Sequence, residues 1–165
     1  IKYSSGVEVN FGNELTPTQV KDQPVVDWPA DNNSYYTLLM TDPDVPSRTD
    51  PNLSEGKHWI VINIPGADVS KGQTLVEYMG SGPFKGTGFH RYIFVVYKQT
   101  DIINTNEKVI SKLTVEGRML WKIKDFAKQY NLGQPIAANF YQAQFDEWVP
   151  IFLKQIGLDP DSFKS

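Results

Sequence analysis

The residues best suited to chemistry are two histidines and one aspartate, and each lies beside an apolar run. His58 and His90 are the two histidines of the chain, and Asp42 opens an Asp-Pro-Asp sequence. Imidazole and carboxylate side chains exchange protons, bind anions or hold a metal ion, depending on what surrounds them. Singly, a histidine at a strand end is more often a packing residue, and Asp-Pro-Asp is usually only a turn. If neighbouring strands bring the three together, they form one site.

Three β-strands are predicted beside these residues. The runs Tyr35–Thr41, His58–Ile64 and Arg91–Tyr97 are dense in β-branched and aromatic residues, and Gly, Pro, Asn or Asp bounds each of them. Val7–Phe11 and Val25–Trp28 are weaker strand candidates by the same criteria. The first half of the chain is therefore predicted to be mostly β.

Alternation along a strand predicts which way the polar groups point. Side chains two residues apart lie on one face, so His58 is expected on the face of Ile60 and Ile62. His90 is likewise expected on the face of Tyr92. Polar groups that end apolar strand faces give a pocket with an apolar floor and a polar rim, which is the usual form of a small-molecule site.

Two helices are predicted late in the chain. Trp121–Tyr130 repeats apolar residues at helical spacing, and a second amphipathic run covers Ala143–Ile156. Pro150 fits either the first turn of a shorter helix or a kink in a longer one. The irregular stretches Thr41–Lys57 and Gly80–Phe89 are rich in Gly, Pro and Ser, and such loops often carry binding groups. Strands followed by helices predict a mostly β domain with peripheral α-helices.

Composition limits the classes of function. The 165 residues, 40% of them hydrophobic, suit one globular domain over residues 1–165, and a net charge of −3 disfavours nucleic-acid binding. The chain has no cysteine and no apolar run long enough for a transmembrane segment, so at most peripheral membrane contact is expected. A cytoplasmic location is predicted. The alternative is secretion after removal of an N-terminal signal, because the chain opens with Ile1.

Several longer segments resemble one family. Tyr36–Arg48 resembles the first signature of the phosphatidylethanolamine-binding protein family, also called the Raf kinase inhibitor family. Gly80–Pro83 followed by Gly86–Tyr92 resembles its second signature, with His58–Asn63 between the two as in the family. Tyr141–Asp146 resembles its C-terminal segment. The likeness covers roughly residues 7 to 156, and two long signatures in the right order are a specific signal.

The resemblance implies both a fold and a ligand. The fold is a large antiparallel β-sheet packed on a smaller sheet, with C-terminal helices. The ligand is a phosphate-like anion or phosphorylethanolamine, held in a small pocket without a cofactor or metal. Carried onto this sequence, the residues that bind the ligand or shape the pocket wall are Asp42, Pro46, His58, Gly82, Pro83, His90 and Tyr92. Asp42 is expected to orient and charge a histidine, or to accept a hydrogen bond from the ligand's ammonium group.

The sequence departs from the family pattern around this pocket. Gly56 and Lys57 stand where many members carry an aromatic residue and a second histidine. Phe84 replaces the second proline of a Pro-Pro pair, Leu153 replaces a tyrosine near the cavity mouth, and Trp148 replaces another tyrosine. The deep part of the pocket is therefore expected to be kept, whereas its rim is expected to differ.

Three other functions compete with or extend simple binding. An enzyme using His and Asp as acid and base is the first, although Ser81 lies in Gly-Ser-Gly-Pro and not in the Gly-x-Ser-x-Gly nucleophile motif. A metal site made by His58, His90 and Asp42 is the second, and nothing in their spacing requires it. The third is an interaction module, since family members regulate kinases or proteases. We expect non-catalytic binding coupled to a kinase or protease partner.

Overall fold

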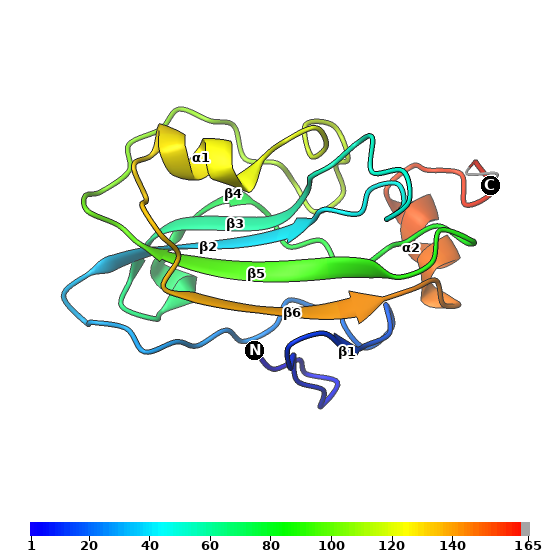
Figure 1. Ribbon diagram of the computed structural model, residues 1–165, viewed down its shortest axis with the longest axis horizontal. Helices are drawn as coiled ribbons and strands as arrows, with labels where there is room; N and C mark the ends of the chain where they lie inside the picture. Colours follow the sequence, from blue (N-terminus) through cyan, green and yellow to red (C-terminus); the bar gives the residue numbers. More distant parts are fainter. Residues whose placement is uncertain (163–165) are drawn as a thin grey trace.

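A six-stranded β-sheet forms the body of the protein in the computed structural model, which describes residues 1–162 (Figure 1). The strand order is β1-β6-β5-β2-β3-β4, and every neighbouring pair is antiparallel except β1 with β6. The strands are β1 (Asn13–Glu14), β2 (Tyr35–Asp42), β3 (Gly56–Pro65), β4 (Gln73–Val76), β5 (His90–Lys98) and β6 (Ala137–Ala143). The α-helices are α1 (Ile123–Gln129) and α2 (Trp148–Gln155), and a short 3-10 helix covers Val69–Lys71.

The predicted class, mostly β with peripheral helices, is confirmed. The three predicted strands are the central β2, β3 and β5, whose apolar side chains are buried. β4 and β6 were not predicted, because β4 is short and β6 mixes Asn and Gln with its apolar residues. The weaker candidates Val7–Phe11 and Val25–Trp28 form no strand and contribute only isolated bridges to Lys2.

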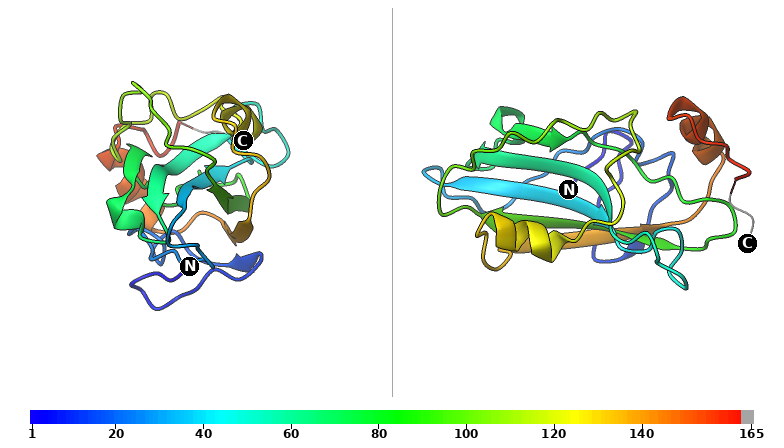
Figure 2. Two further views of the ribbon diagram at one scale, coloured as in Figure 1. Left: turned by 90° about the vertical axis from the view of Figure 1, so that its left-hand side faces the viewer. Right: turned by 90° about the horizontal axis from the view of Figure 1, so that it is seen from above.

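Figure 2 shows the N-terminal segment and the segment of α1 on different sides of the sheet. The buried apolar residues form two clusters. The N-terminal segment packs Tyr3, Val9 and Val20 against one face, and this segment with its isolated bridges stands where the resemblance implied a smaller sheet. On the other face, α1 contributes Phe126 and Ala127 to a second cluster. Since both faces are buried, the central strands read as nearly continuous apolar runs.

Both predicted helices are present in shortened form. α1 lies inside the predicted range, and α2 begins at Trp148 with Pro150 in its first turn, which is the first of the two alternatives. The predicted helical start at Ala143 is wrong. Ala143 pairs with His90 as the last residue of β6, because the chain remains in the sheet until that point.

A β-bulge in β3 overturns the predicted direction of His58. Met40 pairs with Trp59 while Thr41 pairs with Lys57, so the intervening His58 has no partner on β2. The extra residue breaks the alternation. His58 therefore contacts Tyr92 on the N-terminal-segment face, whereas Ile60 belongs to the α1 face.

One end of the sheet gathers the polar groups. Asp42 ends β2, His58 lies near the start of β3, and His90 starts β5, and Figure 1 shows α2 beside this end. The loops 43–55 and 77–89 leave the sheet here. None of the helices within residues 1–162 is long and apolar enough to span a bilayer.

Candidate functional site

A cavity of about 320 Å³ opens at this end of the sheet. Its lining includes all seven residues that sequence analysis assigned to a pocket, namely Asp42, Pro46, His58, Gly82, Pro83, His90 and Tyr92. The loops between strands and helix α2 supply most of the remaining wall. The chain thus brings together groups that lie up to 50 residues apart in sequence, and their role in binding stays a prediction.

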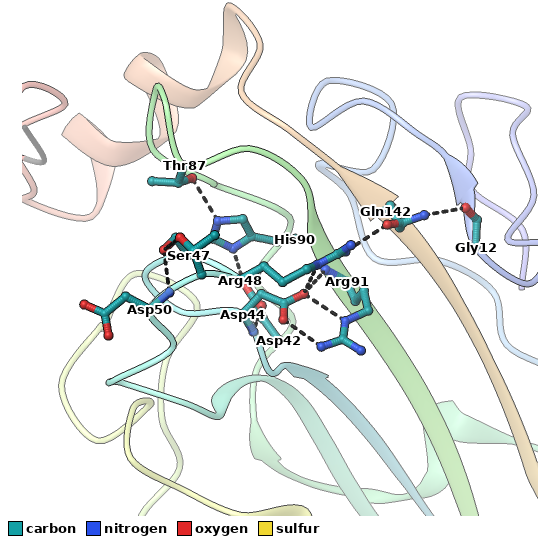
Figure 3. Close-up of polar contacts among 11 residues, drawn as sticks. Gly12, Asp42, Asp44, Ser47, Arg48, Asp50, Thr87, His90, Arg91 and Gln142 are labelled. Atoms are coloured by element: carbon teal, nitrogen blue, oxygen red, sulfur yellow. Dashed lines mark hydrogen bonds and ion pairs between the residues drawn. The ribbon is translucent and has the colours of Figure 1, made fainter. Parts of the chain in front are cut away.

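Asp42 and His90 form a buried hydrogen-bonded pair. His90 Nδ1 lies 2.8 Å from Asp42 Oδ2, and His90 Nε2 lies 2.9 Å from the hydroxyl of Thr87 (Figure 3). The Thr87 hydroxyl donates its single hydrogen to the Phe84 carbonyl at 2.8 Å, so it accepts from Nε2. With Nδ1 donating to the carboxylate, both ring nitrogens carry hydrogen. This is the hydrogen-bond arrangement that an imidazolium–carboxylate pair would make, and the orienting role of Asp42 stays a prediction.

Asp44 holds the loop that follows Asp42. Its side chain is buried and accepts three hydrogen bonds from Arg91, at 2.8 to 3.0 Å, while Arg48 lies on its other side (Figure 3). Burial alone would raise the pKa of Asp44, but hydrogen bonds and charge from Arg91 outweigh it and lower that pKa. The Asp44 backbone N–H also donates to Asp42 Oδ1 at 2.7 Å. Both oxygens of Asp42 are therefore engaged within the protein.

The surroundings of His58 favour its neutral form. Its Nδ1 lies 2.7 Å from the Met79 carbonyl, and since a carbonyl only accepts, Nδ1 carries the hydrogen. Burial lowers the pKa of His58, with the Asp42 carboxylate opposing the shift and Arg118 adding to it. The ring stands edge-on to Tyr92, with 5.2 Å between ring centroids. A neutral His58 retains a lone pair on Nε2 that protonation would turn into a donor.

Arg118 is a buried cation held by backbone alone. The residue is 0% exposed, and burial lowers the pKa of its guanidinium to about 10, against the field of Glu77. Within the described part of the chain, no carboxylate lies within ion-pair distance of it. Its five N–H groups donate to the carbonyls of Lys57, His58, Glu77, Ser111 and Thr114 at 2.7 to 3.5 Å. Arg118 thus ties three segments together and leaves a positive charge beside the cavity.

Tyrosine rings form the floor behind the histidines. Tyr92 stacks on Tyr141 with 5.1 Å between ring centroids and lies parallel to His90 at 6.4 Å. Burial raises the pKa of Tyr92 well above its usual value, and the Asp42 carboxylate adds to the shift. Ser81 contacts the hydroxyl of Tyr141 at 2.5 Å and no histidine. Ser81 therefore has no hydrogen-bonded histidine to activate its hydroxyl as a nucleophile.

The changed rim residues have identifiable surroundings. A Cβ placed at Gly56 would lie 3.2 Å from Val45 and 3.5 Å from the Met119 sulfur, so these two side chains fill the space near that position. The ammonium of Lys57 lies 5.9 Å from the centroid of the Trp121 ring, and Lys57 lines the cavity. Burial lowers the pKa of Lys57, with Glu107 opposing and Arg118 adding to the shift.

Several residues of the site escaped sequence reasoning. Arg118 lies in an irregular stretch whose pattern gave no strand or helix, and no local signal marks it. Thr87 and Asp44 fall inside the two family signatures, where they could have been found as partners of His90 and Arg91. Phe152 contributes to the cavity wall from α2. Among residues 1–162, no cluster of three or more His, Asp or Glu side chains is arranged to hold a metal ion.

These features define a class before any comparison: a small β domain with a cavity at the strand ends whose lining includes Arg118 and Lys57. The sequence profile of the phosphatidylethanolamine-binding protein family matches residues 5–142. The chain belongs to the phosphatidylethanolamine-binding protein family.

Individual relatives agree with this assignment. The 26 kDa secreted antigen of Toxocara canis is 43% identical over 146 residues, which cover 87% of this chain and 55% of the antigen. The chain thus spans little more than half of that relative. The solution structure of CG7054 is 51% identical, with a TM-score of 0.76 over 93% of this chain and 88% of that one. Carboxypeptidase Y inhibitor, solved in complex with its cognate proteinase, is 30% identical, with a TM-score of 0.71 over 88% of this chain and 81% of that chain.

Proposed function

We propose that the chain binds small phosphate-like anions, including phosphorylethanolamine, in this cavity without chemical turnover. The observation that carries the proposal is the buried Arg118 charge beside the cavity, which no carboxylate of the described chain pairs. His90, by contrast, has the Asp42 carboxyl group as its hydrogen-bond partner. A bound anion is therefore attracted by the unpaired charge of Arg118.

Individual groups take distinct roles in this proposal. Lys57, which lines the cavity, donates directly to the anion, and Arg118 acts through its field because its own N–H groups are engaged. The Tyr92 hydroxyl is a further donor at the floor. An ethanolamine ammonium, where present, is expected on the side of Asp42.

Calorimetric titration tests this assignment. Phosphorylethanolamine and sulfate are titrated into the wild type, into Lys57→Met, and into Lys124→Met, which removes an exposed lysine of α1 away from the cavity. A hydrogen bond to a charged group contributes about 1.5–3 kcal/mol, so Lys57→Met should weaken binding by tenfold or more. Lys124→Met should stay within twofold of the wild type. Absence of binding to the wild type, or equal loss in both variants, contradicts the proposal.

The pH dependence gives a second readout. Because burial favours neutral His58 and an anion favours its protonated form, binding should weaken as the pH rises from 5 to 8. Sulfate is the appropriate probe, since its charge is constant over this range whereas a phosphate monoester gains charge near pH 6. A flat profile for sulfate would exclude His58 from the site.

Regulation of a protease is a second candidate function, favoured by the inhibitor complex at 30% identity. Carboxypeptidase Y activity measured against rising concentrations of this protein should fall if the inhibitory surface is shared. Full activity at a large excess would rule out this target. Kinase regulation rests on the family resemblance alone. A secreted location draws support from the Toxocara antigen, and the cytoplasmic alternative remains a prediction.

A further inference from the structure

A groove of about 400 Å³ lies beside α1, apart from the ligand cavity. Its wall comes from β5, from α1 and from the connection to β6, and consists of Tyr97, Lys124, Ala127, Lys128, Asn131, Gly133, Gln134 and Pro135. None of these residues lines the cavity at the strand ends. In Figure 1, α1 and α2 lie toward opposite ends of the sheet, so the groove and the cavity are separate features.

The Tyr97 hydroxyl is the polar tip of a buried side chain and has no partner in the fold. Tyr97 is 6% exposed, and its hydroxyl makes no hydrogen bond within residues 1–162. In that range the one side-chain polar atom that is both sealed from solvent and unpartnered is Trp28 Nε1, so the Tyr97 hydroxyl reaches solvent, in the groove that Tyr97 lines. Burial raises the pKa of Tyr97, with Glu55 adding to the shift, so the hydroxyl stays a donor at neutral pH. A ligand can therefore supply the acceptor that the fold does not.

Two lysines give the groove a positive charge. Lys124 and Lys128 are exposed, and in the described part of the chain neither lies within ion-pair distance of a carboxylate. The lining contains no Asp or Glu, although the whole chain carries a net charge of −3. One exposed lysine attracts an isolated anion only weakly, because water screens the charge. A ligand that carries two carboxylates gains from both lysines at once.

We propose that the groove binds an acidic peptide segment of a partner protein, with two carboxylates at alternate positions as in Glu-x-Glu. Residues four apart in an α-helix are separated by about 6 Å along its axis, which is the relation between Lys124 and Lys128. Alternate residues of an extended peptide point to the same side and are separated by about 6.6 Å. The two spacings match, and a carboxylate held there can also accept from Tyr97.

Two primary amides in the lining favour a peptide over a bare anion. Asn131 and Gln134 are exposed, and their side-chain amides make no hydrogen bond within residues 1–162. Each amide offers both a donor and an acceptor, as the backbone of a bound peptide requires. Sulfate, in contrast, uses donors only. The lining therefore suits an extended acidic stretch of a protein.

Two peptides of identical composition test the spacing. Acetyl-Gly-Glu-Ser-Glu-Gly-amide and acetyl-Gly-Glu-Glu-Ser-Gly-amide carry the same charge, but only the first presents both carboxylates on one side when extended. Each is titrated into nitrogen-15-labelled protein at low ionic strength, where charge is least screened. The Glu-Ser-Glu peptide should bind at least threefold more tightly than the Glu-Glu-Ser peptide and should shift the amide signals of residues 123–134. Equal affinities, or shifts confined to other residues, would overturn the proposal.

Substitutions in the groove locate the effect. Tyr97→Phe keeps the buried ring and removes the hydroxyl, so the affinity for the Glu-Ser-Glu peptide should fall about tenfold. Lys128→Met should lower it about threefold and abolish the preference between the two peptides. Lys154→Met is the matched control, because it removes an exposed lysine of α2, changes the net charge equally and should leave the affinity unchanged. Equal losses in Lys128→Met and Lys154→Met would mean attraction by net charge alone, which contradicts the proposal.

A vesicle experiment distinguishes a peptide from a membrane surface. Wild type and Lys128→Met are sedimented with phosphatidylserine vesicles, and the two proteins should sediment to the same small extent. Strong sedimentation of the wild type that Lys128→Met loses would assign the lysines to a membrane surface and overturn the peptide proposal.

Discussion

Buried charges have different partners in the two halves of the cavity base, one around Asp42 and the other around Arg118. On the Asp42 half, His90 faces the Asp42 carboxyl group, and Asp44 pairs with Arg91 and Arg48 further out. On the Arg118 half, the cation meets only backbone carbonyls, and the nearby His58 is kept neutral. Carbonyl dipoles satisfy the donors but leave the net charge. Charge is therefore balanced in one half and uncompensated in the other.

This difference identifies which half an anion should approach. A paired half keeps its geometry with or without ligand, so it acts as a rigid frame. The unpaired half improves its electrostatic energy when an anion arrives, because the buried guanidinium gains a counter-charge. Substitutions in the two halves should consequently change the anion affinity in different directions. Their effects on stability should also depend on pH in different ways.

Arg118→Met should cause the largest loss of stability. Five backbone carbonyls lose their donor, and at about 1 kcal/mol each the free energy of unfolding should fall by about 5 kcal/mol in urea titrations. Arg118→Lys keeps the charge and three donors, so it should lose less stability and retain most of its sulfate affinity. If the two variants bind sulfate equally poorly, the charge is not what attracts the anion. If Arg118→Met does not fold, sulfate binding by Arg118→Lys alone tests whether the charge at this position attracts the anion.

Asp42→Ala should have the next largest effect. Removing one partner of a buried ion pair typically costs about 3–5 kcal/mol, because the other charge is left unpaired. Asp42→Asn should lose less, since its amide can donate to a His90 that has lost the Nδ1 hydrogen. Nitrogen-15 NMR of the His90 ring checks this directly: both nitrogens carry hydrogen in the wild type and only Nε2 in Asp42→Asn. Identical spectra for the two proteins would contradict the imidazolium geometry.

Sequence patterns predicted the central strands, and the residues they assigned to a pocket line one cavity, although the binding role of these residues stays a prediction. The runs that became β2, β3 and β5 have the length, β-branched content and boundaries of buried strands, so local reading finds them. The pocket set came from two long family signatures, and these side chains do meet at one end of the sheet.

Features that depend on long-range packing could not be predicted. The bulge that turns His58 toward Tyr92 arises from its register with β2, which alternation within one strand does not contain. Arg118 donates to carbonyls on β3 and beyond β4, which lie about 60 and 40 residues earlier in the chain, respectively. The cavity wall likewise combines segments that lie far apart in the sequence.

The pH dependence of stability should separate the two halves. The folded-state pKa of His58 is lowered, so its contribution is complete above the unfolded value of about 6.5 and is lost as the pH falls below it. The stability difference between wild type and His58→Asn should therefore shrink from pH 7.5 to pH 5. The pKa of Asp44 is also lowered, so the difference from Asp44→Asn should stay constant to about pH 5 and fall only below about pH 4. Urea titrations at four pH values test both predictions. If the two stability differences shrink over the same pH range, the separation of the two halves is contradicted.

Of these substitutions, Thr87→Val should lower the free energy of unfolding the least, and it should strengthen sulfate binding. Valine keeps the shape but removes the oxygen that accepts from His90 Nε2, so a loss of about 1–2 kcal/mol is expected. The freed N–H belongs to a charged ring that lines the cavity, and it becomes available to a ligand. Sulfate should then bind several-fold more tightly to Thr87→Val, whereas Thr87→Ser, which keeps the hydroxyl, should match the wild type. Unchanged sulfate binding by Thr87→Val would mean that the anion does not reach the Asp42 half, which would then be purely structural.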